Sequence, residues 1–276
     1  MTILNKGKFL AIMGFGIGMA AIITQPSFAD QLDTIRQKGK LQVAIDLGNP
    51  PYAMRDAQFQ PTGSEVETAK LLAKDMGVDI EFLTVPTSGR IPFLVSGKAD
   101  LAVSTLSITE ERLEVVDFSI PYAETAIVVA APKEANVKSY ADLTDASVAV
   151  TRGTVNDTNL TEQTADVSGV QIVRFEDDPT SSAAVTSGQL AIYATSRPLL
   201  TELIKANPNL DLEEKFVAKA YPLGVALRMN EPKLKEWIDG WITTNLDNGK
   251  LVDIYEKYHG ARLDPQKLLA SDLPRS

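Results

Sequence analysis

The feature that most constrains the fold is the alternation of short apolar runs with helical patterns. Residues 41–46 (LQVAID) predict a strand, which the turn-forming residues 48–51 (GNPP) end. A helix is predicted next, with Gly77 as its C-cap and residues 79–84 as a second strand; its apolar positions are Val66, Ala69, Leu72, Ala73 and Met76. Strand, helix and strand in this order predict parallel α/β layers.

The alternation continues along the chain. A short helix over 91–96, a strand over 100–104 and a helical turn capped by Thr109 are expected. A new β-α unit begins at residues 147–150. It continues with the segment 181–187, a strand over 190–194 and a helix over 198–206.

Two long apolar runs, 125–131 and 216–229, lie on either side of this second unit. The chain therefore crosses twice between two cores, which predicts two lobes, each a mixed sheet flanked by helices. We expect one lobe from residues 30–124 with 222–276 and the other from residues 125–221. The hinge is expected near 124–126 and 218–221.

The N-terminus is typical of an export signal. Lys6 and Lys8 precede an apolar run over 9–23, and residues 26–29 (PSFA) supply small residues for cleavage. We expect residues 1–29 to be removed; a membrane anchor is the alternative, but the run is short for a span. The chain has no cysteine, which excludes disulfides and a lipid-modified cysteine. A free periplasmic protein is expected.

Charge and composition limit the classes of partner that the protein can bind. The remaining 247 residues carry 25 basic and 36 acidic side chains, a formal charge of −11, which argues against nucleic acid binding. No catalytic nucleophile, metal site or cofactor site stands out. The single histidine, His259, is expected as a solvated residue at a helix end, and the tail after Gly260 as a surface extension.

The order of the segments resembles the polar amino-acid-binding proteins of ABC transporters, bacterial extracellular solute-binding protein family 3. The resemblance covers almost all of the mature chain, and its strongest carrier is residues 90–122, RIPFLVSGKADLAVSTLSITEERLEVVDFSIPY. Other carriers are LQVAIDLGNPPY, EVETAKLLAKDMGV, ADLTDASVAVTRGT and WITTNLDNGKLVDIYEKYHG. It implies a periplasmic binding protein type II fold, a monomer that closes on an amino acid or related carboxylate, and an inner-membrane permease as partner.

Within residues 90–122, a carboxylate site is expected. Ser104, Thr105 and Ser107 follow a predicted strand, and the next helical turn presents backbone N–H groups beside Arg112. In the family, the residue matching Arg112 forms a bidentate pair with the ligand carboxylate, which lysine could not reproduce. A surface ion pair of Arg112 with Glu110 or Asp117 is the alternative.

The resemblance implies further contacts. Gly153 and Thr154 match the position where the second lobe clamps the same carboxylate through a backbone N–H and a hydroxyl. Asp46 matches a ligand-facing position at the end of the first strand, and Tyr52 an aromatic near the mouth of the cleft. An aspartate that caps a turn and a tyrosine that covers an edge are the respective alternatives.

The sequence also departs from the family. Ser196 aligns with the aspartate that binds the ligand α-ammonium in many members, and Asn49 with a frequent pocket aromatic. Arg90 aligns with a residue that contacts a distal carboxylate in acidic amino-acid binders, and Arg152 precedes the clamp glycine. This pattern predicts an anionic ligand, a dicarboxylate or an acid without an ammonium group, unless Arg90 and Arg152 point outward.

Two other functions are weighed. Dehydratases acting on arogenate or prephenate share the fold, and Asp157 lies near the position of their general acid. The simpler interpretation of Asp157 is a first-turn helix residue stabilised by the helix dipole. A sensory binding module is the third possibility, and it would need a separate signalling partner.

Overall fold

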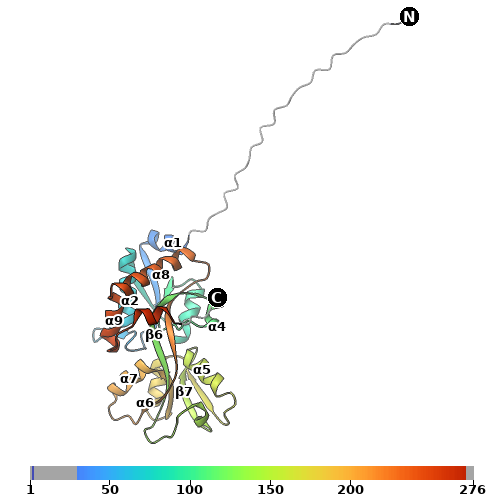
Figure 1. The fold of residues 1–276 in the computed structure, drawn as a ribbon, viewed down its shortest axis with the longest axis vertical. Helices are drawn as coiled ribbons and strands as arrows, with labels where there is room; N and C mark the ends of the chain where they lie inside the picture. The colour runs from blue at the N-terminus through green and yellow to red at the C-terminus, as the bar shows by residue number, and fades with distance from the viewer. Residues whose placement is uncertain (1, 3–29, 272–276) are drawn as a thin grey trace.

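The computed structural model describes residues 2 and 30–271, so the expected signal peptide lies almost wholly outside the described residues. An eight-stranded sheet runs through the molecule in the order β4-β1-β5-β10-β6-β9-β7-β8. Helices cover it in two parts, seen in Figure 1 with α1, α2, α8 and α9 above and α5, α6 and α7 below. The mixed α/β architecture predicted from the alternation is confirmed.

The strands of the large sheet are β1 (Lys40–Ile45), β4 (Asp79–Thr84), β5 (Leu101–Ala102), β6 (Asp117–Ala131), β7 (Ser147–Thr151), β8 (Gln171–Phe175), β9 (Ile192–Ser196) and β10 (Glu213–Leu227). The two-stranded ribbon consists of β2 (Met54–Arg55) and β3 (Pro61–Thr62). The helices are α1 (Gln31–Lys38), α2 (Ser64–Met76), η1 (Thr87–Gly89), α3 (Arg90–Val95), α4 (Glu110–Leu113), η2 (Tyr140–Leu143), α5 (Val155–Gln163), α6 (Asp178–Thr186), α7 (Arg197–Ala206), α8 (Pro232–Asp247), α9 (Lys250–His259) and α10 (Pro265–Leu269).

The two parts are joined by β6 and β10, which are each 15 residues long and pair antiparallel. On either side of this pair the sheet is parallel, with β5, β1 and β4 at one end and β9, β7 and β8 at the other. The two segments in which we expected the hinge face each other, because Thr125 pairs with Tyr221 and Ala126 with Ala220. Figure 1 shows β6 passing from the upper part into the lower part.

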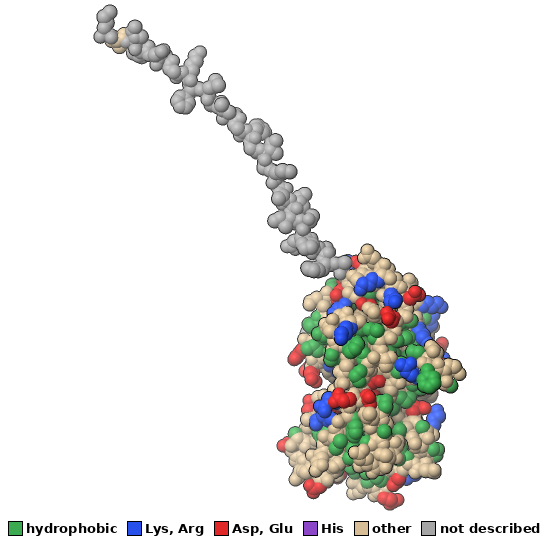
Figure 2. All heavy atoms as spheres, turned by 180° about the vertical axis from the view of Figure 1, so that it is seen from behind, with side chains coloured by type: hydrophobic (Ala, Val, Ile, Leu, Met, Phe, Trp, Pro, Cys, Tyr) green, Lys and Arg blue, Asp and Glu red, His purple; other side chains and the backbone are tan. Residues whose placement is uncertain are grey.

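The buried apolar residues form separate clusters on the two sides of this junction. Three clusters draw only on residues 32–123 and 223–268, and two draw only on residues 128–216. Each part therefore buries its own apolar surface, which is the main stabilising term in folding. From behind, Figure 2 shows the two parts one above the other, with side chains of both charge signs where they meet.

Local signals placed most elements correctly. Gly77 ends α2 in the left-handed conformation, and the Thr109 hydroxyl accepts a hydrogen bond from the Arg112 N–H as an N-cap. The tail after Gly260 was predicted wrongly as a surface extension, because Leu263 and Leu268 are buried in the upper core. Helices α1 and α10 and strand β8 were not predicted. In the described part of the chain, no helix has the length and apolarity to cross a bilayer.

Candidate functional site

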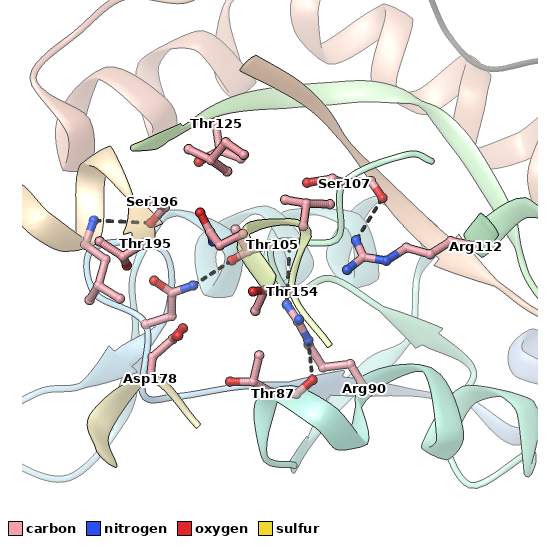
Figure 3. A pocket seen from close by; sticks show the side chains of 15 residues that line it. Thr87, Arg90, Thr105, Ser107, Arg112, Thr125, Thr154, Asp178, Thr195 and Ser196 are labelled. Carbon is pink, nitrogen blue, oxygen red and sulfur yellow. Dashed lines mark hydrogen bonds between the residues drawn. The ribbon is translucent and has the colours of Figure 1, made fainter. Parts of the chain in front are cut away.

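A polar cavity lies between the two parts of the molecule (Figure 3). About 400 Å³ of space lies between its walls when the open solvent at its mouth is included. The upper part contributes loops after β1 and β5 and the helical turn before α3, while the lower part contributes the N-terminal ends of three helices. The cavity is lined by Asn49, Thr87, Arg90, Thr105, Ser107, Arg112, Thr125, Ile127, Thr154, Val155, Asn156, Asp178, Thr195, Ser196 and Leu199.

Arg112 bridges the cavity walls. Its Nη1 donates to the Ser107 carbonyl at 2.9 Å, and its Nη2 donates to the Gly153 carbonyl of the opposite part at 3.0 Å. The side chain is 8% exposed, and burial followed by the nearby charge of Arg90 lowers the pKa of Arg112 to about 9, which leaves it charged at neutral pH. The sequence-based alternative, a surface pair with Glu110 or Asp117, is wrong.

Arg90 lies in the same wall and is 4% exposed. Its Nε donates to the Thr87 carbonyl at 2.7 Å, and its Nη1 donates to the Ser104 carbonyl at 2.6 Å. Burial lowers its pKa, and the carboxylates of Asp46 and Asp178 oppose that shift. Among the described residues, no carboxylate lies within ion-pair distance of either buried arginine. Two buried guanidinium groups therefore line the cavity without a direct ion pair, with the Asp46 and Asp178 carboxylates farther away.

The loop that carries Thr105 is held by a buried carboxylate that the sequence analysis did not select. Thr105 has a φ of +48°, a left-handed conformation that costs energy for a β-branched residue. Glu65 accepts hydrogen bonds from the Thr105 N–H, from its hydroxyl at 3.2 Å and from the Tyr122 hydroxyl at 2.9 Å. Burial raises the pKa of Glu65 to about 7 against the effect of these donors.

The opposite wall is built from three helix N-termini. Strands β7, β8 and β9 are parallel, so the helices that follow them begin at the same edge of the sheet. Thr154, Asp177 and Ser196 are the N-caps of α5, α6 and α7, each accepting a backbone N–H through its side-chain oxygen. The unpaired N–H groups of the first turns favour anionic atoms in the cavity.

Several buried polar atoms of the cavity have no hydrogen-bond partner among residues 30–271. They are the side-chain oxygens Asn49 Oδ1, Ser107 Oγ, Thr125 Oγ1 and Asn156 Oδ1. Buried polar atoms are nearly always hydrogen-bonded in folded proteins, because an unpaired one costs about 1–3 kcal/mol. A polar ligand in this cavity would satisfy them.

Six of the residues predicted for the site line the cavity: Arg90, Thr105, Ser107, Arg112, Thr154 and Ser196. The others do not. Asp46 accepts from the Gly48 N–H at 2.8 Å and from the Thr87 hydroxyl, so it shapes the loop instead of facing the cavity. The Ser104 hydroxyl accepts from the Asp46 N–H at 2.9 Å and has the same role.

Tyr52, Arg152 and Gly153 also depart from their predicted places. Tyr52 is 1% exposed and belongs to the upper core, because the chain turns inward after the two prolines. Arg152 points outward and pairs with Glu176 at 2.9 Å. The Gly153 N–H donates to Asp157 Oδ2 at 3.2 Å, so it does not face the cavity, although the Gly153 carbonyl accepts from Arg112.

His259 is not the solvated residue that we expected. Its ring stacks on Tyr255 with centroids 4.1 Å apart, and its Nε2 lies 2.9 Å from the Ser64 hydroxyl. Burial lowers the pKa of His259 to about 4, so it is neutral at physiological pH. The described residues contain no cluster of three or more side chains able to hold a metal ion.

Comparison with known proteins gives the family. The model of the bacterial extracellular solute-binding proteins, family 3, matches residues 41–261. The chain therefore belongs to this family. The L-cystine-binding protein TcyJ of Escherichia coli strain K12 is 29% identical over 257 residues, which cover 91% of this chain and 95% of that protein.

Two solved structures show the same two-lobed fold. The solute receptor for L-cysteine of Neisseria gonorrhoeae is 29% identical, with a TM-score of 0.78, over 85% of this chain and 97% of that one. The ancestral amino acid-binding protein AncCDT-1, a precursor of cyclohexadienyl dehydratase, is 32% identical, with a TM-score of 0.75, over 84% of this chain and all of that one. The predicted family and fold are confirmed.

Proposed function

We propose that the protein is the solute-binding component of an ABC transporter and encloses an amino acid between its lobes. The observation that carries this proposal is the pair of buried arginines, Arg90 and Arg112, in a cavity between two separately packed cores. Charge that is buried without a partner is costly, so a cavity built this way favours an anionic group. The names of the relatives, which bind cystine, cysteine and other amino acids, support a ligand with a carboxylate.

Arg112 and Ser107 are proposed to bind the ligand carboxylate. Two N–H groups of the Arg112 guanidinium donate to carbonyls, which orients its plane and leaves other N–H groups for the ligand. Ser107 adds an unpaired hydroxyl, and the first turn of α5 after Thr154 adds backbone N–H groups from the other side. A carboxylate held from both walls couples binding to closure.

We propose that the lobes are residues 30–124 with 222–276, and residues 125–221, with the hinge where Thr125 pairs with Tyr221. This division matches the apolar clusters, none of which draws on both sets. Few contacts then cross the cleft: the bond from Arg112 to Gly153 and one from Ser88 to Glu176 at 3.2 Å are two of them. Because a ligand adds contacts to both walls, it shifts the equilibrium toward the closed state.

A binding role is proposed in preference to dehydratase chemistry. A general acid must reach the proton it transfers, and Asp157 does not line the cavity. Its Oδ1 pairs with Arg174 at 2.7 Å, and its N–H donates at 3.2 Å to the hydroxyl of Thr154, the N-cap of α5. Asp157 is thus used in stabilising the second lobe.

The proposed setting follows from the family. We propose that the protein is exported to the periplasm with removal of residues 1–29. We also propose that it is a monomer and delivers its ligand to an inner-membrane permease. The formal charge of −11 outside residues 1–29 suits a soluble carrier.

Isothermal titration calorimetry of the purified protein tests the function. The protein is refolded from denaturant to remove any ligand that it retains, and then titrated with L-cystine, L-cysteine and the other common L-amino acids. At least one is expected to bind with a dissociation constant of about a micromolar or below, the affinity that a site with two or more charge-assisted contacts supports. No heat from any of them would contradict the proposal.

A further inference from the structure

A carboxylate that the resemblance to the family does not indicate lies in the wall of the cavity. Asp178 is the first residue of α6, follows the end of β8, and is 6% exposed. Its Oδ1 accepts from the Thr151 hydroxyl at 2.6 Å, while its Oδ2 accepts no hydrogen bond from residues 30–271. Figure 3 shows Asp178 on the side of the cavity away from Arg112.

Two neutral acceptors line the same cavity as Asp178. Asn49 Oδ1 and Asn156 Oδ1 are buried and have no hydrogen-bond partner in the described part of the chain. The Asn49 amide is oriented through its Nδ2, which donates to the Thr105 hydroxyl at 3.3 Å. Three acceptor oxygens in one cavity need a ligand group with several N–H or O–H donors.

Asn49 and Asp178 are brought together across the cleft by close packing of their chain neighbours. A Cβ at Gly48 would lie 2.6 Å from the ring of Pro179, so the loop after β1 touches the start of α6. These acceptors therefore come from both lobes, as Arg112 and the first turn of α5 do at the carboxylate end.

The cavity thus has two chemically different ends. At one end, Arg112 and Ser107 offer donors and positive charge. Away from Arg112, Asp178 and Asn49 offer acceptors and one carboxylate, near the charge of Arg90. An α-amino acid carries a carboxylate and an ammonium group on the same Cα atom, so it can supply an anion to the donors and a cation to the acceptors. A simple carboxylate or a dicarboxylate would leave the acceptors unpaired.

Ser196 does not replace the missing aspartate of other family members. Its hydroxyl accepts from the Leu199 N–H at 3.4 Å, which makes it the N-cap of α7. The carboxylate in this wall comes instead from the start of α6 after β8, which is separated from β9 by β7. Loss of the acid at Ser196 therefore does not predict a ligand without an ammonium group.

We infer that Asp178 binds the α-ammonium group of the ligand, assisted by the amide oxygen of Asn49, so that the ligand is an amino acid with a free α-amino group. This inference rests on the proposed function and reverses the expectation of a dicarboxylate. It makes Asp178 the residue that discriminates amino acids from the corresponding acids without nitrogen. The pKa of Asp178, which burial raises to about 6, would fall on pairing with an ammonium.

Matched pairs of compounds test the inference by calorimetry. The pairs are L-cysteine with 3-mercaptopropionate, L-glutamate with glutarate, L-aspartate with succinate, and L-glutamine with glutaramate. In the unchanged protein, an L-amino acid is expected to bind at least about 100-fold more tightly than its partner, because the partner leaves a buried carboxylate unpaired. The variant Asp178→Asn should lose about 30- to 1,000-fold in affinity for that amino acid and little for its partner.

Asp177→Asn is the matched control. Asp177 is the exposed neighbour and caps α6 through the Thr180 N–H at 2.9 Å, a role that asparagine also fills. Its affinity for the amino acid should stay within about threefold of the unchanged protein. Thermal melts of both variants without ligand separate a loss of folding from a loss of binding.

The outcomes distinguish the inference from the proposed function. If glutarate, succinate or another partner compound binds as tightly as its amino acid, the inference is wrong and the carboxylate site stands. If Asp178→Asn weakens both members of a pair equally and lowers the melting temperature, Asp178 supports Arg90 structurally and the inference is wrong. If no compound binds to the unchanged, folded protein, both fail.

Discussion

Replacing Arg112 with methionine should separate binding from folding stability. The Arg112 guanidinium is buried with no carboxylate partner among residues 30–271, and burial lowers its pKa to about 9. Desolvating such a charge costs several kcal/mol, which two hydrogen bonds to the Ser107 and Gly153 carbonyls offset only in part. Methionine has a similar volume and no charge. The variant is therefore expected to melt at the same temperature as the unchanged protein or higher.

The effect on ligand affinity should be large and opposite. A bidentate carboxylate pair makes two charge-assisted hydrogen bonds of about 1.5–3 kcal/mol each. Losing both costs about 3–6 kcal/mol, which corresponds to a fall in affinity of about 10²- to 10⁴-fold. Calorimetry with the tightest-binding L-amino acid gives the affinity, and scanning calorimetry without ligand gives the melting temperature.

Arg152→Met is the matched control, because Arg152 is an exposed arginine paired with Glu176 outside the cavity. Its affinity should stay within about threefold of the unchanged protein. Affinity retained by Arg112→Met would refute the assignment of the carboxylate site. A large drop in its melting temperature would refute the argument that the buried charge is unfavourable in the free protein.

Three further predictions follow from the same structure. First, the affinity for the amino acid should be constant above about pH 6 and should fall by up to about tenfold per pH unit below it. The reason is that Asp178, which lies near Asp46, Arg90 and Asp177, has a pKa raised to about 6 and must ionise to pair with an ammonium group. Titrations between about pH 7 and pH 5 measure this, and affinity that rises on acidification would contradict it. Second, His259 should lower the free energy of unfolding by up to about 3 kcal/mol as the pH falls from about 6.5 toward 4. Its pKa is about 4 in the folded protein, so in this pH range the imidazole is protonated in the unfolded chain and not in the folded one. Denaturant titrations should show a weaker pH dependence of stability in His259→Asn, and an equal pH dependence would exclude this effect of His259. Third, Gly48→Ala should weaken binding by about 5- to 100-fold. The added Cβ would lie 2.6 Å from the Pro179 ring across the cleft, and overpacking of this kind costs about 1–3 kcal/mol. Unchanged affinity would show that this contact is absent from the bound state.

The elements that could be predicted are those whose signals are local. The spacing of apolar residues defined α2, and Gly77 and Thr109 marked a helix end and a helix start. Strand β8 was missed because it lies at the edge of the sheet, where its residues 171–175 (QIVRF) are only partly buried and carry no clear alternation. The tail was missed because Leu263 and Leu268 contact a core built by distant segments.

The candidate site could be predicted only in part for the same reason. Arg112 follows a strand end and a capped turn, so its chain neighbours already indicate a carboxylate site. Whether Arg152 faces the cavity depends on Glu176, which lies on another loop and draws it outward. Asp178 carries a local signal, since Asp177, Asp178 and Pro179 are typical of a helix start, but its place opposite Asn49 depends on how the two lobes meet.

A crystal structure of the protein with its tightest-binding L-amino acid tests the central claim most directly. The account predicts the amino acid enclosed between the lobes, its carboxylate on Arg112 and Ser107 and its ammonium group within hydrogen-bond distance of Asp178. An amino acid bound elsewhere, or bound in the cavity with its carboxylate away from Arg112, would contradict it.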